Sequence, residues 1–354
     1  MFGIDVRAAR AAWTVFLVAL VIATIYAIRQ TVVVLACALL FAYLLMPVLA
    51  LVERYSPRRV SPTLALAIVY LGLLGALIGA GFSIGGRIAD EATMLSDRLP
   101  SLLQNREWID SIWLPGWLEP ARQKIVLYIQ GEFATGGKDL LPYVKNFGAQ
   151  VLSSAKYLLD IILVPILAFF FLKDGQAMRE ALVDSFVETS RQPMVEDILS
   201  DINHLLGKYI RALVLLALSS FMCYALFLGI TGGPYAVLLA GIAGLFDFIP
   251  VIGPLAAGLL VIIVEGVSGY THLLWFVIFW PIFRLFQDYV LAPALMGAGV
   301  ELNPTLVLFG VLAGEQIAGV PGMFFSVPVL ATLRVIFVRL KRARAKRVGV
   351  VEVA

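Results

Sequence analysis

Apolar runs long enough to cross a bilayer recur throughout this sequence. Examples are residues 11–28, 31–52, 63–84, 152–172 and 211–230, each close to the roughly 20 residues with which an α-helix crosses the hydrocarbon core. Hydrophobic residues make up 61% of the 354 and charged residues 14%, whereas soluble domains carry about 25% charged residues. Strands of a membrane barrel would alternate apolar and polar residues, and these runs do not. The sequence therefore predicts an all-α polytopic membrane protein with about seven or eight transmembrane helices.

Clusters of lysine and arginine indicate which side of the membrane each end of the chain occupies. The tail holds seven Lys or Arg between Arg334 and Arg347, the link 53–59 holds three arginines, and two more arginines precede the first span. Basic residues next to spans favour the cytoplasmic side, where they also contact anionic lipid. We prefer this interpretation of the tail to nucleic-acid binding. It predicts that both termini are cytoplasmic and that residues 86–150 lie outside.

The residue types that carry most enzyme chemistry are sparse in this chain. The two cysteines, Cys37 and Cys223, lie inside apolar runs, and the two histidines, His204 and His272, share no ligand spacing with them. The sequence contains no complete phosphate-binding loop, no G-x-S-x-G and no H-E-x-x-H motif. We therefore expect no cofactor, no metal site and no enzyme activity.

Two late apolar segments share a pattern in which proline and glycine interrupt a helix beside an acid. The first, DFIPVIGP, places Asp247 before Pro250, Gly253 and Pro254; the second, EQIAGVPG, places Glu315 before Pro321 and Gly322, with Pro328 further on. A proline in a helix interior removes a hydrogen bond and costs about 3 kcal/mol. Chance similarity between two apolar helices is the alternative to a true repeat.

A helix broken inside a membrane is tolerated where the break lines a cavity or binds a ligand. The ends of the half-helices then present oriented dipoles and free carbonyl groups to a solute or ion. We therefore expect the two breaks, each with its acid, to form the functional site. Each segment is about 30 residues long, which fits either a kinked crossing or a re-entrant hairpin, and the pattern does not decide between them.

Charged residues within the late spans are further candidates, because charge inside the membrane is costly and by default marks function. Arg284 and Asp288 are four residues apart, so they share one helix face and can pair. Such a pair belongs either to a transport path or to a clamp that fixes helix rotation. Small neighbours around Glu315 fit a hydrated pocket, whereas Glu265 and His272 flank a loop, where we expect solvated side chains.

Polar stretches divide the chain into six predicted segments. They are an N-terminal three-span segment (1–85), an amphipathic extracytoplasmic region (86–150), the fourth span (151–175), a cytoplasmic amphipathic helix region (176–210), a transport core with the two broken-helix repeats (211–340) and a basic cytoplasmic tail (341–354). We expect the fourth span to end at Gly175, because glycine often follows the last helical residue.

Three stretches of the sequence resemble the autoinducer-2 exporter (AI-2E) family, also called PerM-like permeases. They are FFFLKDG (169–175), DFIPVIGP (247–254) and residues 286–330, which contain an N-P turn and a GVPG…VP ending. The resemblance implies a bacterial inner-membrane protein that forms homo-oligomers. It also implies export of a small polar signalling molecule or, as in other members, sodium/proton exchange.

The predicted function is secondary transport of a small polar solute by alternating access around the two breaks. The candidate solute or ion path comprises Asp247, Pro250, Gly253, Pro254, Arg284, Asp288, Asn303, Pro304, Glu315, Pro321, Gly322 and Pro328. The alternatives are a sodium/proton antiporter and a non-transporting scaffold, whose partner surfaces would be the apolar stripe at 195–209 and the tryptophan-rich region around 108–117. A membrane enzyme ranks third, because no nucleophile–base set is found.

Overall fold

The computed structural model describes residues 6–55, 62–104, 155–185, 192–296 and 302–348. Within these ranges the chain forms helices joined by short turns, with no strand, so the all-α prediction is confirmed. Residues 56–59 of the predicted basic link, the tryptophan-rich region and the last residues of the basic tail lie outside the described ranges.

The described helices differ widely in length. They are α1 (Val6–Ala27), α2 (Arg29–Tyr55), α3 (Pro62–Gln104), α6 (Ala155–Asp184), α7 (Gln192–Thr231), α8 (Ala236–Phe246), α9 (Ile252–Val267), α10 (Leu273–Phe286), the π-helical turn η1 (Gln287–Leu291), α11 (Ala292–Met296) and α12 (Pro304–Val348). Five stretches are long and apolar enough to cross a membrane, and they lie in α2, in α3, in α7, in the continuous run of α10, η1 and α11, and in α12. Three shorter apolar stretches lie at Ala12–Val21, Ala236–Phe246 and Ile252–Val267. The chain is a multi-pass membrane protein.

Three long helices run past the boundaries that the sequence suggested. α3 continues beyond residue 85, and α7 joins the apolar stripe at 195–209 and the span at 211–230 into one 40-residue helix. At about 1.5 Å per residue, α7 is ~60 Å long, roughly twice the thickness of the hydrocarbon core. The predicted end at Gly175 is wrong, because α6 continues to Asp184 through Ala, Met, Arg, Glu and Leu, which are strong helix formers.

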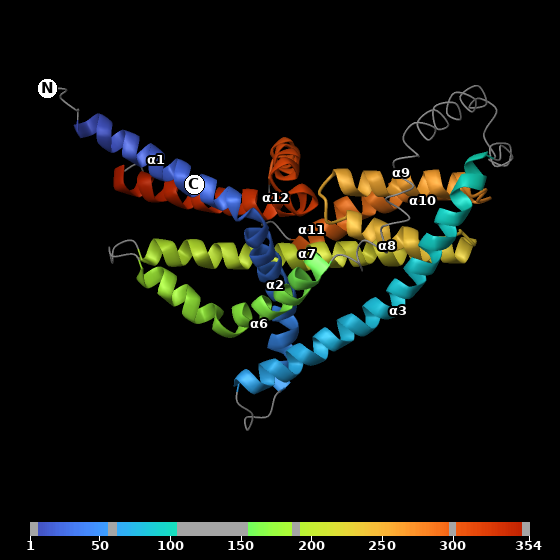
Figure 1. The fold of residues 1–354 in the computed structure, drawn as a ribbon, viewed down its shortest axis with the longest axis horizontal. Helices are drawn as coiled ribbons and strands as arrows, with labels where there is room; N and C mark the ends of the chain where they lie inside the picture. Colours follow the sequence, from blue (N-terminus) through green and yellow to red (C-terminus); the bar gives the residue numbers. More distant parts are fainter. Residues whose placement is uncertain (1–5, 56–61, 105–154, 186–191, 297–301, 349–354) are drawn as a thin grey trace.

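α8 and α9 form a helical hairpin, which we call the first hairpin. The two helices have 11 and 16 residues, or ~16 and ~24 Å, so neither crosses the ~30 Å core alone. They pack against each other, and α8 packs against α7; Figure 1 shows α7, α8, α9 and α10 lying side by side. The first broken segment is therefore a hairpin and not a kinked crossing.

A tight turn closes the first hairpin. The N–H of Ile252 donates to the carbonyl of Pro250 over 2.7 Å, and Val251 between them has φ 65° and ψ −56°, the rare and strained form of the γ-turn. Gly253 follows, where a Cβ atom would lie 1.8 Å from the carbonyl oxygen of Phe246. The close approach of the two helices therefore requires glycine at this position.

α12 also folds back on itself, and we call its two arms, 304–317 and 320–348, the second hairpin. Helical geometry is lost at Ala318 and Gly319. A Cβ atom at Gly314 would lie 2.2 Å from the carbonyl oxygen of Gly322, and one at Gly310 would lie 2.6 Å from Leu330. In a straight helix, residues 314 and 322 would be ~12 Å apart. Both broken segments are therefore hairpins.

The two hairpins lie toward opposite ends of α7 and meet between them. The Tyr270 hydroxyl, beyond the open end of the first hairpin, donates to Thr231 at the C-terminus of α7. Val327 of the second hairpin packs instead with Tyr209, 22 residues or ~33 Å back along α7. The Phe248 ring in the turn of the first hairpin lies edge-on to Phe324 of the second, with centroids 5.6 Å apart.

Candidate functional site

Asp247, directly after the last residue of α8, lies at the centre of a buried polar network. Its side chain is 5% exposed. The Ser220 hydroxyl from α7 donates to Oδ2, and Gln287 Nε2 from η1 donates to the same oxygen over 3.0 Å. Arg284 Nη1 from α10 lies 3.7 Å from Oδ1. The network therefore joins the turn of the first hairpin to the two helices that flank it.

The position of Asp247 is unfavourable without these donors. The residue is the C-cap of α8, where the negative end of the helix dipole repels a carboxylate. Burying an ionised carboxylate also costs a large desolvation energy unless charged or polar partners compensate for it. Two hydrogen bonds and a guanidinium supply that compensation. A ligand that replaced one of these partners would therefore bind to a group that needs a donor or a cation.

Gln287 owes its position to a break in helical geometry. It is the first residue of η1, a five-residue π-helical turn between α10 and α11, and such turns occur frequently at functional sites. Its amide nitrogen lies 3.1 Å from the carbonyl oxygen of Leu216 and 3.0 Å from the Ser220 hydroxyl. Gln287 therefore ties this irregular part of the span to α7 as well as to Asp247.

Arg284 is shared between a buried and an exposed carboxylate. Its Nη2 lies 2.5 Å from Asp288 Oδ1, and its Nε donates to Asp288 Oδ2 over 2.9 Å. A further hydrogen bond of 3.0 Å runs from Nη1 to Gln287 Oε1. The Asp288 side chain is 45% exposed. The predicted Arg284–Asp288 pair is present, and it continues inward to Asp247, which the four-residue spacing alone does not predict.

A cavity of about 760 Å³ lies beside the break of the second hairpin. Its lining comes from the start of α2, from α6 and from the break itself, and includes Arg29, Cys37, Pro165, Gln316, Ala318 and Pro321. Arg29 packs over the Tyr26 ring, 4.8 Å from its centroid, and its Nη1 lies 3.5 Å from the carbonyl oxygen of Ile317. A backbone carbonyl beside the break and a guanidinium from α2 therefore meet at the wall of this cavity.

A profile described as AI-2E family transporter matches residues 15–342. The match takes in α7, the first hairpin, most of the second hairpin and the Asp247 network. This chain belongs to the AI-2E transporter family. It is therefore a membrane transport protein, and the resemblance noted in its sequence is confirmed.

Relatives of this AI-2E transporter occur in bacteria and archaea. The "Putative transport protein YrrI" of Bacillus subtilis is 24% identical over 317 residues, 87% of this chain and 86% of its own length. YueF of the same organism, also named as a transport protein, is 25% identical and covers 84% of this chain and 80% of its own. A protein of Methanothermobacter thermautotrophicus with a similar name is 28% identical and covers 80% of each chain. The similarity thus extends along most of each protein.

Within this AI-2E transporter, the two repeated acids have different surroundings. Asp247 is buried in its network, whereas Glu315 is exposed, three residues before Ala318. Glu315 makes no hydrogen bond or ion pair with the residues that the structure describes, and it does not line the cavity beside the break. The structure therefore does not bring the two acids into one site.

The remaining predicted residues shape the backbone. Pro250 accepts the γ-turn hydrogen bond, and Pro254 is buried in the first turn of α9. Asn303 Oδ1 accepts the N–H of Thr305 over 2.9 Å, capping α12, and Pro304 occupies its first position, where the missing N–H costs nothing. The other three lie in the second hairpin, with Pro321 on the cavity wall, Gly322 against Gly314 and Pro328 buried in the second arm.

Sequence reasoning missed three polar residues. Ser220 and Gln287 complete the Asp247 network, and their only sequence signal is a polar side chain inside an apolar run. The third missed residue is Glu265, which was expected to be solvated but is fully buried. The neighbouring prediction for His272 is confirmed, because that side chain is exposed. α9 continues to Val267, which places Glu265 inside the helix and not in the loop.

Proposed function

We propose that this protein exports a small polar solute, similar to autoinducer-2, by alternating access around its two hairpins. The observation that carries the proposal is the buried Asp247–Ser220–Gln287–Arg284 network at the turn of the first hairpin. It offers a carboxylate, an amide, a hydroxyl and a guanidinium within one apolar helix bundle. Such a set matches the hydroxyl and carbonyl groups of a small polar molecule.

The sharing of Arg284 supplies a physical route for binding and release. When a solute hydroxyl takes the place of Arg284 at Asp247, the guanidinium keeps its two contacts with Asp288. The Arg284 charge is then still paired, and Asp247 exchanges a guanidinium for a hydrogen-bond donor, so neither group is left without a partner, a state that would cost several kcal/mol. Solute and guanidinium would thus alternate as partners of Asp247.

Two features of the hairpins support movement between inward-facing and outward-facing states. The first hairpin turns through Val251, whose positive φ is strained for a β-branched residue. The two hairpins touch through the edge-on pair of Phe248 and Phe324. Parting this aromatic contact would open a path between the Asp247 network and one side of the membrane, and restoring it would close that path.

Sodium/proton exchange is a second candidate function, favoured by the same shared guanidinium. A cation that replaced Arg284 Nη1 would be held by two oxygens that this nitrogen now contacts, Asp247 Oδ1 and Gln287 Oε1. Oxygen ligands of this kind suit hard cations. The difference between the two candidates is whether the partner of Asp247 is a neutral solute or an ion.

The proposal includes a location in the bacterial inner membrane, cytoplasmic termini and a homo-oligomeric assembly. The basic clusters of the sequence support the orientation. In the structure, the second arm of α12 carries part of the basic tail as a helix, and Arg339 of this arm pairs with Asp197 and Asp201 near the start of α7. These residues would form a cytoplasmic extension beyond the membrane.

Transport by the purified protein in proteoliposomes tests this proposal. Liposomes loaded with autoinducer-2 would be followed for its release, under imposed sodium and proton gradients and with an internal pH dye. Release above that of protein-free liposomes is expected. Sodium-dependent pH change without solute release would assign the second candidate instead. If folded protein gave neither solute release nor a pH change, both candidate functions would be contradicted. The scaffold alternative would then be favoured.

A further inference from the structure

Glu265 is a buried acid without a partner. It lies two residues before the end of α9 and is 0% exposed. Within the described part of the chain, neither carboxylate oxygen accepts or donates a hydrogen bond. Buried polar groups are nearly always paired, so each exception needs an explanation. An isolated carboxylate pays a desolvation penalty that the neutral acid avoids.

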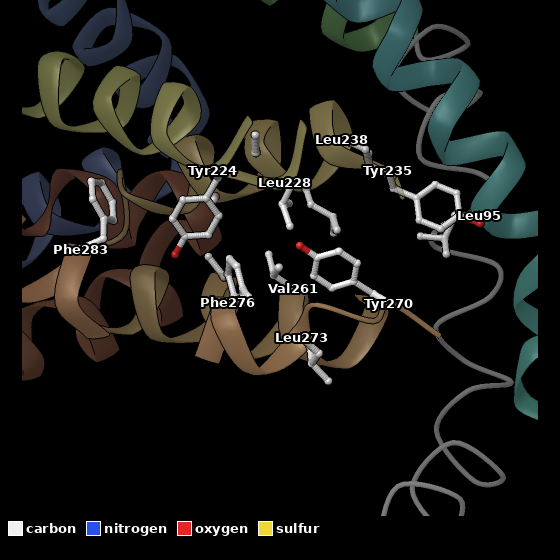
Figure 2. Packing of buried hydrophobic residues seen from close by; sticks show 14 residues of the cluster. Leu95, Tyr224, Leu228, Tyr235, Leu238, Val261, Tyr270, Leu273, Phe276 and Phe283 are labelled. Carbon is white, nitrogen blue, oxygen red and sulfur yellow. The ribbon is translucent and has the colours of Figure 1, made fainter. Parts of the chain in front are cut away.

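The surroundings of Glu265 are mainly apolar. Val261, one helical turn earlier on α9, belongs to a buried cluster with Leu228 of α7 and Leu273 of α10, and Figure 2 shows Tyr270 reaching into this cluster from the α9–α10 loop. A Cβ atom at Gly233 would lie 3.1 Å from Glu265 Oε1. The chain thus leaves room for the carboxyl group and encloses it.

Two titratable groups act on Glu265 from neighbouring elements. They are the carboxylate of Glu91 on α3 and the phenol of Tyr270. The Tyr270 hydroxyl donates its proton to Thr231 and not to Glu265. In the described residues no Lys, Arg or His forms an ion pair with Glu265. The acid therefore interacts electrostatically with a second carboxylate and lacks a cation that would offset its own charge.

Glu91, by contrast, has a structural donor. Its Oε2 accepts the backbone N–H of Leu238 over 2.8 Å. Leu238 is the third residue of α8, and the first N–H groups of a helix have no partner within it and attract negative charge. Glu91 therefore caps the first hairpin from α3. The carboxyl groups of Glu91 and Glu265 interact, but their surroundings differ. Glu91 accepts a hydrogen bond, whereas Glu265 has no hydrogen-bond donor among the described residues.

We propose that Glu265 is a proton-binding site that couples transport to protons. With the first hairpin packed on α3 and α7, Glu265 holds a proton and is a neutral acid. When the hairpin parts from α3, the Glu91–Leu238 hydrogen bond breaks and water reaches the carboxyl group. Its O–H bond then releases the proton to water and leaves a carboxylate. The inference rests on the transport function proposed above and assigns its coupling ion.

The proton site is testable without transport. The infrared carbonyl band of a protonated carboxyl group would be recorded for the full chain in lipid nanodiscs from low to neutral pH. A band that persists at neutral pH in the wild type and disappears in Glu265→Gln is expected. Glu180→Gln, which changes an exposed acid hydrogen-bonded to Gln176, is the matched control and keeps the band. A wild type without the band, or a band that survives Glu265→Gln, would overturn the site.

Coupling is tested by solute release from proteoliposomes with and without a proton gradient. We expect the rate of solute release to depend on the proton gradient in the wild type and in Glu180→Gln. In Glu265→Gln the rate should be the same with and without the gradient. Glu265→Met, which removes the buried acid altogether, should fold and show the same indifference. If wild-type release ignored the gradient, the coupling would be overturned while the transport function stood. If the wild type released no solute, the coupling and the transport function would both be overturned. The infrared band would still show whether Glu265 binds a proton.

Discussion

Gln287 Nε2 donates to Asp247 Oδ2 over 3.0 Å, although 40 residues separate the two in the sequence. This hydrogen bond links the turn of one hairpin to a π-helical turn in the adjoining span, so two irregular backbone regions share one buried site. The same amide group contacts α7 through Leu216 and Ser220. Movement of the first hairpin relative to α7 and α10 would therefore change the contacts of Asp247 first.

Neutralising Asp247 should stop transport and leave the fold intact. Asp247→Asn keeps the size of the side chain but removes the negative charge that interacts with Arg284 and accepts the hydrogen bond of Gln287. A hydrogen bond to a charged group contributes about 1.5–3 kcal/mol, so we expect solute release to fall roughly 10- to 100-fold. Asp174→Asn, which changes an acid beside Lys173 whose side chain is 46% exposed, is the control. Normal release by folded Asp247→Asn protein would remove Asp247 from the path.

Removing Asp288, the outer partner of Arg284, should strengthen the pairing of Arg284 with Asp247. In Asp288→Asn, Arg284 retains Asp247 as its carboxylate partner, so a solute has to displace a more firmly held guanidinium. Exposed ion pairs are worth up to about 1 kcal/mol, so the KM for the solute should rise up to roughly fivefold with little change in kcat. An unchanged KM, measured from release at varied internal solute, would mean that the Arg284–Asp288 pair is a fixed clamp.

The turn of the first hairpin should not tolerate a side chain at Gly253. In Gly253→Ala the new methyl group would lie 1.8 Å from the carbonyl oxygen of Phe246, and both are parts of a rigid backbone. Overpacking of this kind costs about 3 kcal/mol or more, so the thermal unfolding temperature in detergent should fall markedly. Gly175→Ala is the matched control, because its methyl group meets nothing within 4 Å and alanine favours the helix. Equal stability of the two variants would contradict the hairpin geometry.

The charged contact between α7 and α12 should contribute little, and in a salt-dependent way. Arg339 donates to Asp201 and Asp197 over 2.6 and 3.1 Å, but all three side chains are at least 32% exposed. Arg339→Ala should lower the free energy of unfolding by about 1 kcal/mol at most, and the difference should shrink in high salt. A large loss that salt does not alter would show that this contact is buried in the assembled protein.

The sequence predicts the helices and the places where they break, because span length and proline–glycine placement are local properties. It does not distinguish a hairpin from a kinked crossing, since that depends on contacts such as Gly314 with Gly322, made only after the chain turns back. The partners of Asp247 lie 27 and 40 residues away, on helices whose rotation the pattern leaves open. The burial of Glu265 likewise depends on how α9 sits among its neighbours.

The central claim, that the two hairpins part during transport, is tested most directly by joining them. Phe248 and Phe324, whose rings are 5.6 Å apart, would be replaced by cysteine in a chain with Cys37 and Cys223 changed to serine, and linked by a short reducible cross-linker. Solute release from proteoliposomes is predicted to stop on cross-linking and to return on reduction, while either single-cysteine chain is unaffected. Undiminished release from fully cross-linked protein would contradict the account.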